Sequence, residues 1–334
     1  MQNKNVDKWL TSKKYMTRLR WAKRMDWTPT PEQIERGLND ENDLVRGQWS
    51  QRTDFTPTPE QIERGLTDES GSVRTRWAER KDYTPTPEQI ERGLTDEYKW
   101  TRLAWAQRKD MSPTPEQMER GLTDVDGDVR KQWAMCMDFT PTSEQVARGL
   151  SDKENSVKEA WAKRMDWTPT PEQIEKGLTD EYMWVRLAWA ERLDWNPTPE
   201  QVERGLTDED KIVRRDWILR HDFTMTLDQV ERALMDKDNY IRQYCAMRTD
   251  FTPTLEQAVR GVHDADISVV KAWLSRTDIK WTQEHIRKGL QHNNTSIRKA
   301  WVDMLQNQNT RVDMLQNQNT SSDVLSELEV LWVL

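Results

Sequence analysis

The segment Thr58-Pro59-Glu60-Gln61-Ile62-Glu63-Arg64-Gly65-Leu66-Thr67-Asp68-Glu69 returns, with small changes, every 28 residues along the chain. The Ile62 position marks the period without insertion or deletion; it holds Val6, Ile34, Ile62, Ile90, Met118, Val146, Ile174, Val202, Val230, Ala258 and Ile286. Self-similarity at a fixed period of this length is typical of a repeat array, in which each module buries its apolar face against its neighbours. The sequence therefore predicts one elongated domain in place of several globular ones.

The first half of each repeat predicts a short helix. Thr58 is a suitable N-cap, Pro59 suits the first helical position, and Gln61 completes a capping box. The Gly65 position holds glycine in nearly every full repeat and Ala233 in one. Since alanine resists a left-handed backbone, this position is predicted to require a small residue that lets a neighbouring helix approach closely.

The second half predicts a second helix. Asp68 is expected to cap it, and Val73 and Trp77 lie four residues apart on its apolar stripe. The chain then leaves the helix before Pro85, because the residue before a proline is pushed out of helical geometry. The aromatic residue at the Tyr83 position is expected to fill this turn.

The run Leu-Thr-Asp-Glu-Ser-Gly-Ser-Val-Arg-Thr-Arg-Trp-Ala at residues 66–78 resembles the second-helix signature of HEAT-like repeats. With the preceding Thr58-Pro-Glu-Gln it is similar to the leucine-rich repeat variant family, whose repeats alternate a short and a longer helix. The resemblance covers residues 6 to about 305 and departs from the family in the repeat length and in the tryptophan of the second helix. It implies an all-α fold, an alpha-solenoid (superhelix) of about eleven 28-residue two-helix repeats, and it implies no activity.

Three regions are predicted. Residues 1–26 form a degenerate N-terminal capping repeat, because the Thr-Pro opening and the glycine are missing there. Residues 27–305 form the alpha-solenoid of ten 28-residue repeats, right-handed and curved, with the second helices lining one face. Residues 306–334 form a C-terminal tail or cap with a ten-residue tandem duplication; both interpretations stay open.

The composition limits the classes of function. Apolar residues make up only 35% of the chain and the net charge is −8, so a strongly basic polyanion-binding surface is disfavoured. No stretch approaches the length of a membrane helix, and no apolar signal region follows Met1. Cys136 and Cys245 are almost four repeats apart and are predicted to be free thiols. A cytoplasmic protein is the resulting expectation.

Residues that recur in nearly every repeat have a structural and a functional interpretation. The tryptophans at the Trp77 position are predicted to be core, although exposed rings could stack bases or hold a peptide. Arg74 and Arg80 are predicted to pair with aspartates at helix starts and turns, although a row of guanidinium groups could bind phosphates. Glu60 and Arg64, four residues apart, are expected to pair on the first helix.

Positions that vary between repeats are the candidates for binding. Two second helices carry large apolar residues where other repeats have small or polar ones. If these residues face solvent they are anchors for a partner, and if not they fill grooves between repeats. The candidate partner-binding residues are Tyr98, Trp100, Leu103, Tyr182, Met183, Trp184 and Leu187.

No catalytic, cofactor-binding or metal-binding motif is predicted. Residues 124–128 resemble the start of a calcium loop but lack its later glutamate, and the four histidines have no zinc-ligand spacing. We expect a noncatalytic scaffold or adaptor that binds a protein or peptide through variable positions of the second helices. The alternative is a nucleic-acid-binding protein that uses the concave face, as some HEAT-like proteins do.

Overall fold

A computed structural model describes residues 6–136 and 138–309 of the 334-residue chain. The chain divides into two compact units, Met1–Trp167 and Thr168–Leu334. The helices of the N-terminal unit are α1 (Asp7–Leu10), α2 (Tyr15–Ala22), α3 (Pro31–Leu38), α4 (Asp43–Ser50), α5 (Pro59–Leu66), α6 (Gly71–Glu79), α7 (Pro87–Leu94), α8 (Lys99–Ala106), α9 (Pro115–Leu122), α10 (Gly127–Ala134), α11 (Ser143–Gly149) and α12 (Asn155–Ala162).

The C-terminal unit repeats the same alternation of a first and a second helix. Its helices are α13 (Pro171–Leu178), α14 (Met183–Ala190), α15 (Pro199–Leu206), α16 (Lys211–Leu219), α17 (Leu227–Leu234), α18 (Asn239–Met247), α19 (Leu255–Gly261), α20 (Ile267–Ser275), α21 (Gln283–Leu290) and α22 (Thr295–Asn309). Over the described residues of both units the regular structure is helical, without strands, and the predicted all-α solenoid is confirmed.

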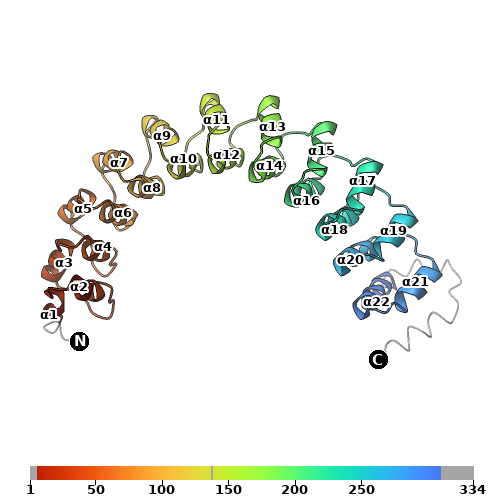
Figure 1. Ribbon diagram of the computed structural model, residues 1–334, viewed down its shortest axis with the longest axis horizontal. Helices are drawn as coiled ribbons and strands as arrows, with labels where there is room; N and C mark the ends of the chain where they lie inside the picture. The colour runs from red at the N-terminus through yellow and green to blue at the C-terminus, as the bar shows by residue number, and fades with distance from the viewer. Residues whose placement is uncertain (1–5, 137, 310–334) are drawn as a thin grey trace. The chain divides into compact units, whose positions relative to one another are not determined.

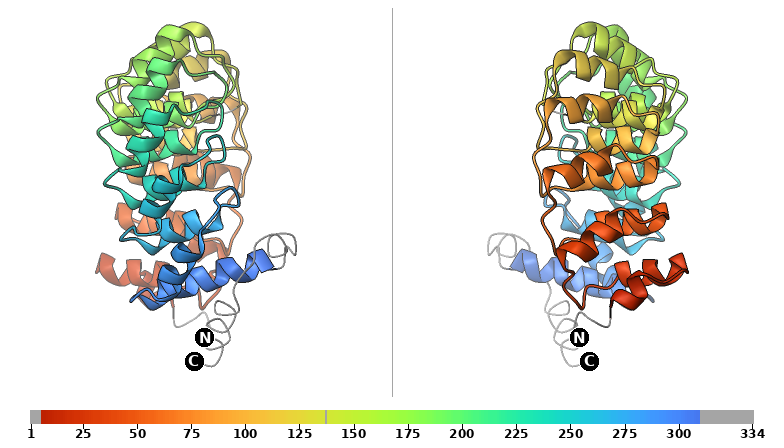
Figure 2. Two further views of the ribbon diagram at one scale, coloured as in Figure 1. Left: turned by 90° about the vertical axis from the view of Figure 1, so that its right-hand side faces the viewer. Right: turned by 90° about the vertical axis from the view of Figure 1, so that its left-hand side faces the viewer.

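Within each unit the helices form two layers (Figure 1). First helices such as α5 and α7 lie in one layer and second helices such as α6 and α8 in the other. The second helices of consecutive repeats pack against each other more extensively than the first helices do. The layer with the closer packing therefore lies on the inner side of the bend in each unit, and Figure 2 shows the N-terminal unit's helix pairs following one another in chain order.

The predicted capping box forms at the start of the first helix. In α5, the Gln61 N–H donates to Thr58 Oγ1 at 3.3 Å, and the Thr58 N–H donates to Gln61 Oε1 at 3.0 Å. Pro59 lies in the first turn, where a missing N–H has no cost. The same box begins the first helix in all full repeats but the last, where Thr282 caps α21 without it.

The predicted cap of the second helix is wrong by two residues. Ser70 is the N-cap of α6, and Asp68 lies before it. The Asp68 carboxylate instead accepts the Ser70 N–H at 2.8 Å, which orders the turn that enters the helix. The Asp68 carboxylate also binds an arginine of the preceding repeat, as described below.

The core of nearly every repeat is built around one tryptophan, which Cys245 replaces in one of them. Trp77 is 1% exposed, and the same position is almost fully buried from Trp49 onward, so the predicted tryptophan core is confirmed. Gly65 lies directly beneath the Trp77 ring, where a Cβ atom would come within 2.1 Å of Nε1. The small residue is therefore required by contact with the repeat's own tryptophan, and the glycine has no positive φ angle.

The two ends differ from the interior. At the N-terminus, Val6 and Leu10 are buried and Trp9 stacks on Trp21 with ring centroids 6.1 Å apart. At the other end α22 extends to Asn309, four residues past the predicted end of the solenoid. The remainder of the predicted C-terminal tail or cap, from residue 310, lies outside the described residues.

Candidate functional site

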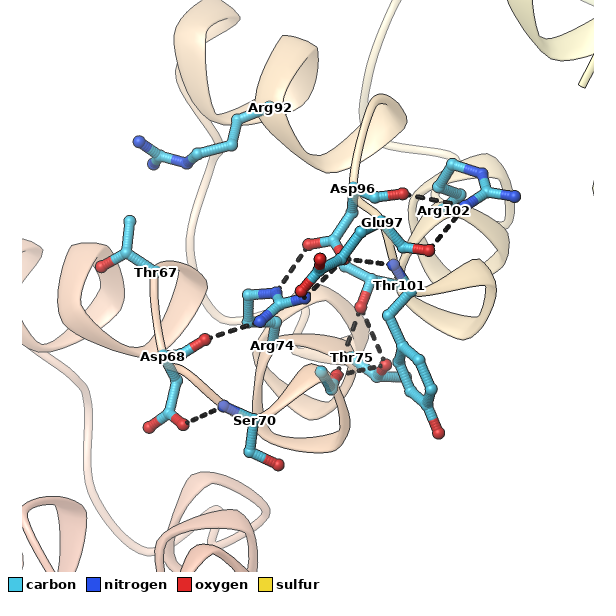
Figure 3. Close-up of polar contacts among 12 residues, drawn as sticks. Thr67, Asp68, Ser70, Arg74, Thr75, Arg92, Asp96, Glu97, Thr101 and Arg102 are labelled. Carbon is cyan, nitrogen blue, oxygen red and sulfur yellow. Dashed lines mark hydrogen bonds and ion pairs between the residues drawn. The ribbon is translucent and has the colours of Figure 1, made fainter.

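The Arg74 position forms a ladder of ion pairs between consecutive repeats (Figure 3). Arg74 donates from Nε and Nη2 to the two Asp96 carboxylate oxygens at 2.7 and 2.8 Å, and from Nη1 to the Asp68 carbonyl at 2.7 Å. Both side chains are largely buried, and the hydrogen bonds to Asp96 raise the pKa of Arg74. Equivalent pairs are Arg18–Asp40, Arg46–Asp68, Arg102–Asp124, Arg130–Asp152, Arg186–Asp208, Arg214–Asp236 and Arg242–Asp264.

The Arg80 position joins repeats in a second way. Arg80 donates to the carbonyls of Ser50 and Arg52 in the preceding repeat at 2.6 and 2.9 Å, and it pairs with Asp82 at 2.5 Å. Its guanidinium also lies 5.0 Å from the ring centroid of Phe55. The buried charge is thus compensated by a carboxylate, by carbonyls and by an aromatic face. The predicted Asp–Arg ladders are confirmed.

The surface pairs of the first helices differ from the prediction. Arg64 pairs with Glu35 of the preceding repeat at 2.7 Å, and Arg92 pairs with Glu63 at 2.8 Å. The expected pairing of Glu60 with Arg64 is therefore wrong. Glu60 lies in the first turn of α5 and accepts hydrogen bonds from its own N–H and from Thr58, which lower its pKa.

One junction in the N-terminal unit lacks the Arg80-type contact. Cys136 occupies this position, and its thiol lies 3.7 Å from the Asp138 carboxylate. In the preceding repeat, Met111 replaces the aromatic residue that an arginine would cover. The same exchange recurs at the end of the C-terminal unit. There Met304 occupies the arginine position and Ile279 occupies the aromatic position. Arginine and aromatic ring are thus replaced together.

The candidate residues of the N-terminal unit lie at the start of α8. Trp100 is 46% exposed, and Lys99 lies over its ring while pairing with Asp126 at 3.1 Å. The Tyr98 ring covers Gly71 of the preceding repeat, which leaves it about two-fifths exposed, and Leu103 is partly buried. Trp100 therefore faces solvent, whereas Tyr98 also fills a groove between repeats.

The candidate residues of the C-terminal unit lie on α14 and at its start. Trp184 is 40% exposed, and Tyr182 and Met183 are partly buried. Leu187 is only 6% exposed. Its side chain belongs to the core and is not accessible to a partner, which corrects its place among the candidate anchors.

The structure adds apolar residues that the sequence analysis missed. In α16 and α18, Ile212 and Tyr240 occupy the same repeat position as Trp184, and Tyr240 is 51% exposed. Seven residues further along the same helices, Leu219 and Met247 are also exposed. We call the set on these three consecutive second helices the apolar strip; it comprises the exposed Trp184, Leu219, Tyr240 and Met247 and the partly buried Ile212.

Two carboxylates accompany the apolar strip. Asp216 of α16 is partly buried, and within the described part of the chain its carboxylate has no hydrogen bond or ion pair. Burial raises the pKa of Asp216, and the nearby negative charge of Glu191 on α14 raises that pKa further. Arg215 and Arg220 act in the opposite direction. The strip therefore combines exposed apolar groups with a carboxylate that has no hydrogen bond or ion pair within the described residues.

The N-terminal unit has a surface hollow with a volume of about 750 Å³. Its cationic lining residues are Arg52, Arg76, Arg80 and Lys81. Arg52 and Arg80 are engaged in the contacts between repeats. Only Arg76 and Lys81 remain for an anion, which is too few for a phosphate chain gripped at regular spacing.

The described residues show neither a metal-binding cluster nor a helix suited to span a membrane. Among the described residues, no group of three or more His, Cys, Asp and Glu side chains is placed to hold a metal ion. Asp124 and Asp126 of the calcium-like segment are engaged by Arg102 and Lys99. Both cysteines are free. Within the same residues, none of the helices has the length and apolar character needed to cross a membrane.

The fold and its contacts define a helical repeat protein. Its structure is similar to a solved structure described as a leucine-rich repeat variant with a novel repetitive protein structural motif. The likeness has a TM-score of 0.51 and 21% sequence identity, and it covers 72% of this chain and 88% of that chain. No family model and no curated protein matches the sequence. The likeness confirms the predicted repeat fold and carries no function with it.

Proposed function

We propose that the protein is a noncatalytic scaffold that binds a protein or peptide through the variable positions of its second helices. The observation that carries this proposal is the exposure of Trp100 and Trp184 at a position where the repeats directly before them have Ser72 and Ser156. Large exposed rings on a rigid helix are typical anchors of a protein interface.

The recurrent charges support this proposal over nucleic-acid binding. A protein that grips phosphates at regular spacing needs a row of free cations. Here the arginines of the Arg74 and Arg80 positions are bound to carboxylates or backbone carbonyls wherever their contacts are described. Nucleic acid remains the alternative, and its test is a salt-dependent mobility shift with duplex DNA or RNA.

We also propose a cytoplasmic location. Free cysteines are typical of a reducing compartment, and Cys245 is fully buried.

The proposal is tested by affinity capture from the native host with the wild-type protein and a Trp100→Ser/Trp184→Ser variant. Leu255→Ser is the matched control, since Leu255 is equally exposed but lies on the first helix α19. We expect partners that are captured by the wild type and the control and lost with the double variant. Partners retained by all three proteins would contradict this use of the second helices.

A further inference from the structure

The apolar strip in the C-terminal unit runs across three neighbouring second helices, and its residues indicate which class of partner it could bind. Trp184, Ile212 and Tyr240 occupy one position on α14, α16 and α18, and consecutive second helices in this unit pack side by side. Leu219 and Met247 extend the exposed surface two turns further along α16 and α18. A segment that crosses these helices would therefore meet an apolar side chain on each one.

The charged groups around the strip include two unpaired carboxylates. Lys211 pairs with Asp238 at 3.1 Å, so this cation is already engaged. Glu191 and Asp216 lie close enough for their charges to interact, and neither has an ion-pair partner among the described residues. Arg215 and Arg220 are the cations near Asp216. Arg220 is already paired with Asp222, so Arg215 leaves one of the two negative charges uncompensated.

A phosphate-bearing partner is disfavoured by these charges. Nucleic acid would bring anions against Glu191 and Asp216. A lysine or arginine from a partner would instead find two carboxylates and the exposed aromatic side chains of Trp184 and Tyr240. Aromatic rings beside carboxylates favour cations, through charge pairing and through contact with the ring face.

We propose that the apolar strip binds a peptide segment that carries lysine or arginine among apolar side chains. The apolar side chains of this segment lie on Trp184, Ile212 and Tyr240, and its cation pairs with Asp216 and Glu191. This inference rests on the proposed scaffold function and assigns the class of partner for the C-terminal unit.

The experiment is a selection from a random library of short displayed peptides on the full-length protein. Peptides that also bind a Trp184→Ser/Tyr240→Ser variant are removed. The dissociation constant of each enriched peptide is then measured by fluorescence anisotropy. A Glu191→Gln/Asp216→Asn variant tests the charges. Leu255→Ser and Glu79→Gln are the matched controls, because Glu79 occupies the repeat position of Glu191 in the other unit.

We expect the enriched peptides to combine lysine or arginine with apolar residues. Both strip variants should weaken their binding by about tenfold or more, and the controls by less than about twofold. Circular dichroism of each variant confirms that it is folded.

Two outcomes would overturn the inference. Enriched peptides that are acidic or uncharged, and indifferent to Glu191→Gln/Asp216→Asn, would refute the charge assignment while leaving the scaffold function intact. Failure to enrich any peptide that depends on Trp184 and Tyr240 would refute the strip as a peptide site, and the capture experiment then judges the scaffold function by itself.

Discussion

Gly65 and Trp77 are matched in volume: a Cβ atom on Gly65 would come within 2.1 Å of the indole Nε1. The same relationship holds twelve residues apart in the other repeats that have both residues, from Gly37 with Trp49 to Gly289 with Trp301. The exception is informative. Where Ala233 replaces the glycine, Cys245 replaces the tryptophan, so the smaller side chain makes room for the added methyl group.

This match predicts a coupled pair of substitutions. Cys245→Trp alone should lower the free energy of unfolding by about 1–3 kcal/mol, because the ring meets the Ala233 methyl group. Adding Ala233→Gly should restore most of that loss, which urea denaturation of the four proteins in the cycle measures. Additive effects of the two changes would show that the residues are not in contact.

Arg80 should be far more important for stability than Arg64, although both form ion pairs. Arg80→Met leaves buried carbonyls and Asp82 without a donor and should cost about 2–4 kcal/mol in unfolding free energy. Arg64→Met removes a half-exposed pair with Glu35 and should cost no more than about 0.5 kcal/mol. If urea denaturation gave the two variants equal losses of unfolding free energy, the buried contacts of Arg80 would contribute no more to stability than the surface pair of Arg64.

Cys136 marks a junction where the arginine contact can be rebuilt. By equivalence with Arg80, an arginine at this position would reach the carbonyls of Ala106, Arg108 and Met111. Cys136→Arg should therefore raise the unfolding free energy by on the order of 1 kcal/mol, and adding Met111→Phe should raise it further. Met135→Arg on the exposed neighbour should give no gain, and a gain there would point to net charge as the cause.

Asp216 should destabilise the protein at neutral pH. Burial and Glu191 raise its pKa, while Arg215 and Arg220 lower it less, so the native state holds the proton more tightly than the unfolded chain. The ionised Asp216 carboxylate therefore lowers the unfolding free energy by its full amount at any pH above its folded-state pKa. This loss disappears as the pH falls below the ordinary aspartate pKa of about 3.9.

Asp216→Asn should therefore raise the unfolding free energy by on the order of 0.5–1 kcal/mol at neutral pH, with a gain that shrinks as the solution is acidified. Thermal melts of the wild type and the variant across this pH range measure the difference. A variant that is less stable than the wild type at neutral pH would show that the carboxylate has a stabilising partner.

Exposed and buried tryptophans should respond differently to the same substitution. Trp184→Ser and Trp100→Ser remove rings that are already about two-fifths open to solvent and should cost under about 1 kcal/mol. Trp77→Ser empties a core position and should cost about 3–5 kcal/mol. A large loss of stability at Trp184 or Trp100 would place these rings in the core and remove them as anchors.

The sequence predicts most of what lies within a repeat. Thr58, Pro59 and Gln61 determine where the first helix begins, and the spacing of Val73 and Trp77 identifies the buried stripe, because these signals act over a few residues. Pairing between repeats is harder to predict. Arg64 finds Glu35 in place of Glu60 because stacking brings the preceding repeat's glutamate closer than the one on its own helix.

The candidate site was only partly predictable for the same reason. Trp184, Ile212 and Tyr240 are 28 residues apart in the sequence, so each resembles an isolated apolar residue. They form one surface only because second helices stack at a fixed register. The burial of Leu187, beside the exposed Trp184, likewise depends on how far each helix is rotated toward its neighbours.

The Arg74–Asp96 ladder has a consequence for how such a chain can change its length. Most repeats present an arginine to the following repeat and an aspartate to the preceding one, so these modules have a head and a tail of fixed polarity. Lys158 and Val270 occupy the arginine position in two of the repeats. Removing residues 59–86, one complete period, would place Asp96 where Asp68 now lies. Arg46 would then pair with Asp96 in the way it now pairs with Asp68. Growth or shrinkage by whole modules therefore conserves every ionic junction, and a deletion of any other size breaks one.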